Sequence, residues 1–160
     1  MCARSGDLDP SIVTYLMKKE NLTPDEAELM LNKESGVLGI SGVSADFRDI
    51  EDAAANGNRR AEIAIDSYAY KVAQYIAQYV VSLNGLDVIA FTAGIGENQY
   101  NIRREICENL ECLGVKIDEN KNHEFRAEGE ISSSDSKVKV FVVPTNEELM
   151  IARDTLNLIK

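Results

Sequence analysis

The chain has 160 residues, a length typical of one domain with its own hydrophobic core. Hydrophobic residues make up 44% of it and charged residues 28%, as in ordinary globular proteins. The formal net charge of −10 argues against nucleic-acid binding, which needs a basic surface. No apolar run approaches the roughly 20 residues of a membrane span, so no membrane partner is expected.

The few cysteines and the single histidine narrow the chemistry further. Three cysteines without a Cys-x-x-Cys pair do not make a disulfide framework, which favours reduced thiols and a cytoplasmic location. The N-terminus lacks the apolar core of a signal peptide. His123 stands alone in a polar stretch, which argues against a histidine-based zinc site and against a Ser-His-Asp triad.

The first half of the chain is predicted to be helical. Asp9-Pro10 and the capping box Thr23 to Glu26 begin helices that end near residues 19 and 32. The glycine-rich segment 35–42 is predicted to be a loop or a short extended piece. A short helix over 46–55 and a long one over 59–83 follow.

The long helix is apolar around most of its circumference, which predicts burial on more than one side. Its tyrosines could form a base-stacking stripe. At helical spacing in an acidic chain, however, we interpret them as core or subunit-contact residues.

The second half alternates strands and helices. The expected elements are a buried strand at 87–91, a helix at 98–113, a short strand at 115–117, a polar stretch at 118–135 with a loop or hairpin tip at 132–134, a strand at 138–143 and a helix at 146–158. This alternation predicts an α/β fold with parallel strands and flanking helices. Two or three strands make a poor independent sheet, so we expect part of the sheet to lie upstream.

Residues 91–98 (FTAGIGEN) are the most informative segment. They join a buried strand to a helix through a glycine-rich turn, an arrangement that lets a backbone approach an anion or a nucleotide. The segment is neither a Walker loop nor a dinucleotide fingerprint. By itself, such a turn is as often a plain strand–helix connection.

Three further segments carry residues suited to phosphate chemistry. Residues 4–10 (RSGDLDP) begin with an arginine, whose forked donors suit a transferring phosphoryl group. Residues 42–49 (GVSADFRD) contain an Asp-Phe-Arg run, and residues 143–152 (VPTNEELMIA) contain an Asn-Glu-Glu run. Each also has a structural interpretation: a solvated terminal arginine, an exposed pair at a helix start, and acids in a first helical turn.

In their order along the chain, the four segments resemble those of acetate kinases. These kinases form the acetokinase family, which belongs to the acetate and sugar kinase, heat-shock chaperone and actin superfamily. The family usually has Gly-Thr before the arginine, where this chain has Cys2-Ala3. The resemblance implies a partial actin-like, ribonuclease H-like ATPase domain. It also implies ATP or ADP as substrate, Mg²⁺, and a homodimer. The implied site residues are Arg4 for catalysis, Asp46, Phe47, Arg48, Gly94, Ile95, Gly96, Glu97 and Asn98 for the nucleotide, and Glu147 for the metal.

Only the C-terminal part of such a kinase is represented. Residues 1–160 correspond to a nucleotide-binding domain truncated at its N-terminal side, and the final helix, 146–158, is expected to pack towards the missing N-terminal domain. The resemblance implies ATP:acetate phosphotransfer, and we expect this chain to be unable to act alone. Alternatives are a non-catalytic dimerisation or remnant module, a chain that works with a separately encoded N-terminal half, or the same part of a propionate or butyrate kinase.

Overall fold

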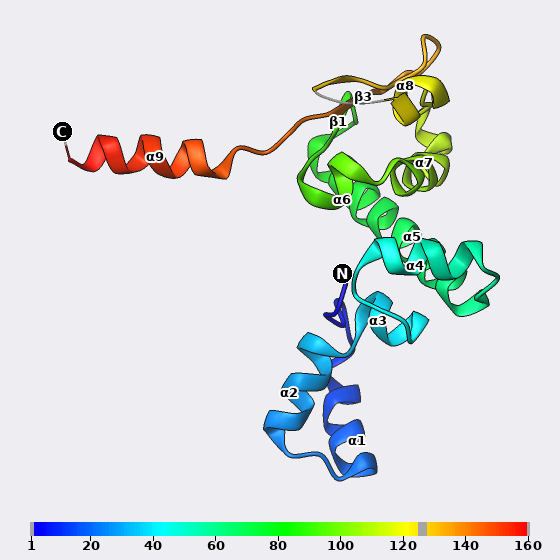
Figure 1. The fold of residues 1–160 in the computed structure, drawn as a ribbon, viewed down its shortest axis with the longest axis vertical. Helices are drawn as coiled ribbons and strands as arrows, with labels where there is room; N and C mark the ends of the chain where they lie inside the picture. Colours follow the sequence, from blue (N-terminus) through cyan, green and yellow to red (C-terminus); the bar gives the residue numbers. More distant parts are fainter. Residues whose placement is uncertain (1, 125–127, 160) are drawn as a thin grey trace. The chain divides into compact units, whose positions relative to one another are not determined.

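The computed structural model describes residues 2–124 and 128–159. The chain divides into two compact units, Met1–Lys71 and Val72–Lys160. The first is helical, and the second combines a small sheet with short helices (Figure 1). Among the described residues, no helix combines the length and apolar character that crossing a membrane requires.

Helices α1 (Pro10–Glu20) and α2 (Pro24–Lys33) begin the first unit, as the sequence predicts. The Asp9 carboxylate accepts a hydrogen bond from the Ser11 amide at 2.8 Å and so caps α1. At α2, Thr23 accepts from the Glu26 amide while the Glu26 carboxylate accepts from the Thr23 amide at 2.8 Å. The predicted capping box is therefore confirmed.

The loop predicted for residues 35–42 is wrong, because Gly36–Ser41 form a helix, α3. Gly36 is its first residue and Gly42 is its C-cap, and both have positive φ. The guanidinium of Arg60 donates to the carbonyls of Gly39 at 3.0 Å and Ile40 at 2.8 Å, so a residue 20 positions away satisfies the end of α3.

Helices α4 (Phe47–Ala55) and α5 (Arg59–Leu83) lie where they are predicted. The buried residues of α5 lie in its first fifteen positions: Ala61, Ala64, Ile65, Ala69 and Ala73. Near its end, Tyr79, Val81 and Leu83 are at least 64% exposed. The predicted burial on several sides is therefore wrong for the last turns of α5 in this chain.

The sheet of the second unit has the strand order β1-β3-β2. Strands β1 (Val88–Phe91) and β3 (Lys139–Val142) are parallel, as predicted, whereas β2 (Gly129–Glu130) runs antiparallel to β3. The burial of β1 alternates, and Val88 is 52% exposed, so the prediction of a fully buried strand is wrong. The strand predicted at 115–117 is reduced to two isolated bridges, Val115 to Val138 and Ile117 to Ser132.

The single helix predicted at 98–113 is divided into α7 (Tyr100–Glu108) and a 3₁₀ turn, η1 (Glu111–Leu113). A further short helix that was not predicted, α6 (Ala93–Asn98), lies between β1 and α7. The predicted polar stretch contains a further helix, α8 (Glu119–Glu124), while its residues 125–127 lie outside the described part. The last helix, α9 (Glu147–Leu158), is confirmed, and none of its residues is buried. Its packing against a further domain stays a prediction.

Candidate functional site

Arg4 lies in a segment that is tied to two helices of the first unit. The Ser5 amide donates to the Leu31 carbonyl at 2.8 Å, and the Ala3 carbonyl accepts from the Ser35 amide at 2.9 Å. These backbone bonds flank Arg4 on both sides, while its own side chain is exposed. The geometry leaves the guanidinium available to an anion, which is compatible with the predicted catalytic role.

Asp46 and Arg48 form a local pair at the start of α4. The Asp46 carboxylate caps the helix by accepting from the Arg48 amide at 2.9 Å. It also accepts from the Arg48 Nε at 3.1 Å. The side-chain hydrogen bond from Arg48 is the main reason that the pKa of Asp46 falls from 3.8 to about 2. The Arg48 side chain is 78% exposed, so its guanidinium plane remains open on its outer face.

Phe47, between these two residues, points the other way. Its side chain is 3% exposed and packs edge to face on Tyr68 of α5, with ring centroids 4.7 Å apart. In this position the ring anchors α4 in the hydrophobic core, and the part of Phe47 in nucleotide binding stays a prediction.

The glycine-rich segment 94–98 follows β1 directly and forms most of α6. Ala93 begins the helix with φ 59, a left-handed conformation that is uncommon for a residue other than glycine. Gly96 packs on the end of β1, since a Cβ atom there would lie 3.2 Å from the Phe91 carbonyl carbon. Gly94, by contrast, has open space around its missing side chain. The side-chain Nδ2 of Asn98 donates to the Gly94 carbonyl at 2.8 Å.

Glu97 joins this segment to the region of the predicted metal ligand. Its Oε1 accepts from the Thr145 amide at 3.0 Å and from the Thr145 hydroxyl at 3.2 Å. Residues 48 positions apart in the sequence therefore meet. Glu147 lies two residues beyond Thr145, exposed in the first turn of α9, where the Asn146 side chain caps the helix.

The sequence does not predict a buried pair, Arg103 and Asn122, that supports the segment 94–98. Arg103 of α7 is 2% exposed and donates to the Gly96 carbonyl at 2.8 Å and the Glu97 carbonyl at 2.9 Å. Its Nε donates to the Oδ1 of Asn122, which is fully buried, at 2.8 Å. Nothing in the spacing of a single sequence marks these two residues as partners.

The predicted site residues thus fall into two sets. Arg4, Asp46, Phe47 and Arg48 belong to the first unit, and residues 94–98 and Glu147 belong to the second. Within the second unit, the structure brings the glycine-rich segment and the Glu147 region together through Glu97 and Thr145. Among the residues that the structure describes, there is no group of three or more histidine, cysteine or acidic side chains that could hold a metal ion. A Mg²⁺ ion held by one carboxylate and by phosphate oxygens does not require such a group.

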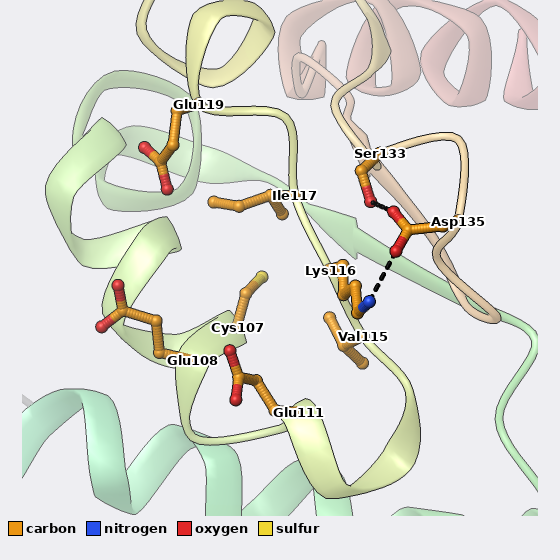
Figure 2. Close-up of a pocket in the computed structure, with 9 residues that line it drawn as sticks. All are labelled: Cys107, Glu108, Glu111, Val115, Lys116, Ile117, Glu119, Ser133 and Asp135. Carbon is orange, nitrogen blue, oxygen red and sulfur yellow. Dashed lines mark hydrogen bonds and ion pairs between the residues drawn. The ribbon is translucent and has the colours of Figure 1, made fainter.

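The second unit also has a pocket of about 300 Å³, which is separate from the predicted site residues (Figure 2). Its acidic lining residues are Glu108, Glu111, Glu119 and Asp135. Lys116 is a positively charged lining residue, and its Nζ is paired with the Asp135 carboxylate at 2.5 Å. This excess of negative charge makes the pocket unsuited to a phosphate or a carboxylate, and none of the predicted site residues lines it.

Comparison with known proteins identifies relatives along the whole chain. The model of the Acetokinase family matches residues 1–153. An acetate kinase of Acetivibrio thermocellus is 53% identical over 160 residues, which are all of this chain and 40% of the relative. The crystal structure of Porphyromonas gingivalis acetate kinase matches with a TM-score of 0.92 and 47% identity, over 100% of this chain and 40% of that one. A propionate kinase structure from Francisella tularensis matches with a TM-score of 0.88 and 43% identity, over 95% and 38%.

The chain thus spans about 40% of the length of the relatives that it matches. The solved acetate kinases have an actin-like ATPase fold, and the predicted fold class is confirmed by this likeness. The chain belongs to the acetokinase family.

Proposed function

We propose that this chain supplies the adenosine-binding and magnesium-binding side of an ATP:acetate phosphotransferase, which forms acetyl phosphate and ADP. The contact of Glu97 with Thr145 carries the proposal, because it joins the two segments predicted to bind adenosine and Mg²⁺. The proposal extends to a cytoplasmic location, which suits the three free cysteines.

Within this function each residue has a distinct part. Residues 94–98 would lie against adenosine, and the open guanidinium of Arg48 would stack on the base. Arg4 would neutralise charge on the phosphoryl group during in-line transfer. Glu147 would give one carboxylate oxygen to Mg²⁺, which supplies positive charge at the phosphates.

The relatives favour two acceptors for the phosphoryl group. Acetate is favoured by the relatives that are acetate kinases, whereas the propionate kinase structure is a specific observation in favour of a longer acyl group. Residues that would hold the acyl group are expected in the portion of the relatives that this chain does not span. We therefore expect no acetyl phosphate formation by the chain alone. Formation above a protein-free control that Arg4→Ala abolishes would contradict this expectation.

Nucleotide binding can be tested on the chain itself. We expect weak binding of ADP with Mg²⁺, near the millimolar range, which corresponds to only about −4 kcal/mol. Titration followed by NMR should shift the backbone amides of residues 94–98. Gly94→Val should weaken binding without unfolding the chain, because the space around Gly94 is open.

Two comparisons complete the test. Gly96→Val should disturb the fold itself, because a Cβ atom there would lie 3.2 Å from the backbone carbonyl carbon of Phe91. Arg48→Ala should weaken ADP binding while leaving the shifts of residues 94–98 in the free chain unchanged. If ADP binds equally well to the unchanged chain, to Gly94→Val and to Arg48→Ala, the proposed site is wrong.

A further inference from the structure

Arg103 is a buried cation within the second unit, 2% exposed. A guanidinium has five N–H donors and no acceptor, so burying it is costly unless carbonyl or amide oxygens surround it. Two backbone carbonyls of α6 and both oxygens of Asn122 accept from it, at 2.8 to 2.9 Å. Burial lowers the pKa of Arg103 from its ordinary value, although arginine stays charged in proteins.

The two α6 carbonyls belong to Gly96 and Glu97, in the last turn of the helix. Carbonyls of a last turn have no partner within their own helix, and a cation beside them is favourable. A helix of six residues is too short to be stable on its own in water. The shape of the segment 93–98 therefore depends on contacts from outside, and Arg103 supplies two of them.

Asn122 fixes the direction of the guanidinium. It is fully buried on α8, and its Nδ2 donates to the Tyr100 carbonyl at 2.9 Å. That bond determines which side-chain atom of Asn122 faces Arg103, so Oδ1 accepts from Nε while the backbone carbonyl accepts from Nη2. The guanidinium of Arg103 is thereby held so that its Nη1 donates to the carbonyls of Gly96 and Glu97 in α6.

We propose that Arg103, oriented by Asn122, is a positioning residue for nucleotide recognition. It holds the segment 94–98 in one conformation before the nucleotide arrives, so that binding does not have to order the backbone. This inference rests on the proposed function only in taking that segment as the adenosine site. Because Arg103 is buried, its effect passes through the carbonyls of Gly96 and Glu97 and not through contact with the ligand.

The decisive variant is Arg103→Lys in the full 160-residue chain. A lysine keeps the charge, but it cannot reach two carbonyls and Asn122 with a planar fork. We expect the amide resonances of residues 93–98 to shift and their hydrogen exchange to speed up in the ligand-free variant. The Kd for ADP with Mg²⁺ should rise at least fivefold at a temperature where circular dichroism shows the variant folded. Asn122→Ala should change the amide exchange of residues 93–98 and the Kd for ADP in the same direction, but by less.

Arg104→Lys is the matched control, since Arg104 is the neighbour on α7 and its side chain is 37% exposed beside Glu108. It should leave the Kd for ADP within twofold and the resonances of residues 93–98 in place. A folded Arg103→Lys variant with the Kd and amide exchange of the unchanged chain would overturn the inference. If Arg103→Lys does not fold, Asn122→Ala decides by the same two measurements.

The two proposals fail in different ways. If ADP leaves the amides of residues 94–98 of the unchanged chain unshifted, the proposed function is wrong. The exchange of those amides in ligand-free Arg103→Lys is measured without ADP. It separately shows whether Arg103 holds the segment, and exchange equal to that of the unchanged chain would overturn the positioning role.

Discussion

Asp46 carries a pH dependence that can be measured directly. Its pKa falls from 3.8 to about 2, mainly through the side-chain hydrogen bond from Arg48 and then through the bond from the Arg48 amide. A lowered carboxyl pKa gives stability that is present above the unfolded value near 3.8 and is lost as the pH falls through about 2. We expect the cap of α4 to remain formed at pH 4 and to be lost near pH 2. NMR titration of the Asp46 carboxyl carbon would give its midpoint.

The variant Arg48→Ala separates the two causes. It removes the side-chain bond but keeps the backbone amide, so the midpoint should rise and remain below 3.8. Arg59→Ala is the control, because Arg59 pairs with Glu62 at 2.7 Å and should not move the Asp46 midpoint. An Asp46 midpoint near 3.8 in the unchanged chain would refute the pairing.

Cys107 and Cys112 are expected to differ sharply in reactivity. Cys107 is 2% exposed, and burial raises the pKa of its thiol to about 12, whereas Cys112 is exposed. Since the thiolate is the reactive form, iodoacetamide at pH 8 should label Cys112 and leave Cys107 unmodified while the chain is folded. Peptide mass spectrometry before and after adding urea would show this. Equal labelling of both thiols in the folded chain would contradict the burial of Cys107.

At the scale of single helices, the capping box of α2 can be tested by one substitution. Thr23→Ala removes the side-chain oxygen that accepts from the Glu26 amide at 3.3 Å, while the rest of α2 stays unchanged. We expect the free energy of unfolding of the first unit to fall by about 1 kcal/mol. Urea denaturation followed by circular dichroism measures this.

Thr14→Ala is the control for α2. Thr14 is exposed within α1 and donates to the Ser11 carbonyl at 3.1 Å, and alanine is a better helix former than threonine. The substitution should leave stability unchanged or raise it slightly. A loss for Thr14→Ala as large as that for Thr23→Ala would mean that the capping box adds nothing specific.

The elements that the sequence predicts well are those fixed by neighbours in the chain. The start of α1 depends on Asp9 and Ser11, and the start of α2 on Thr23 and Glu26, all within three residues. Helices α3 and α6 could not be predicted in the same way. Each is six residues long and is held at its end by an arginine of a later helix, Arg60 or Arg103.

The candidate site shows the same difference between features fixed by neighbouring residues and features fixed by distant ones. Its segments were predicted from their resemblance to acetate kinases, because each is a short continuous run that one sequence shows in full. The contacts that support them join residues far apart, such as Glu97 with Thr145 and Arg103 with Asn122. Such pairs depend on how the chain folds back on itself. Periodicity and capping patterns contain no signal for them.

At the scale of the whole molecule, two helical segments of the second unit expose several large apolar side chains among the residues that the structure describes. One is the end of α5, where Tyr79, Val81 and Leu83 are 64%, 82% and 71% exposed. The other is α9, where Leu149 and Ile151 are 42% and 66% exposed. Contiguous apolar patches above a few hundred Å² are uncommon on monomers and usually mark an association surface. Either surface could be covered by a second copy of the chain or by a further part of a longer protein.

We predict that the isolated chain forms a dimer with the end of α5 at or near the contact, as in closed two-fold assemblies that bury the same patch of both copies. Light scattering at micromolar concentration should give twice the mass of the chain. Val81→Glu should shift the mass towards that of one chain, because it places a charge in the contact. The control Ile151→Glu changes the other surface and should leave the dimer intact. A monodisperse monomer at these concentrations would refute the prediction, and a dimer broken only by Ile151→Glu would move the contact to α9.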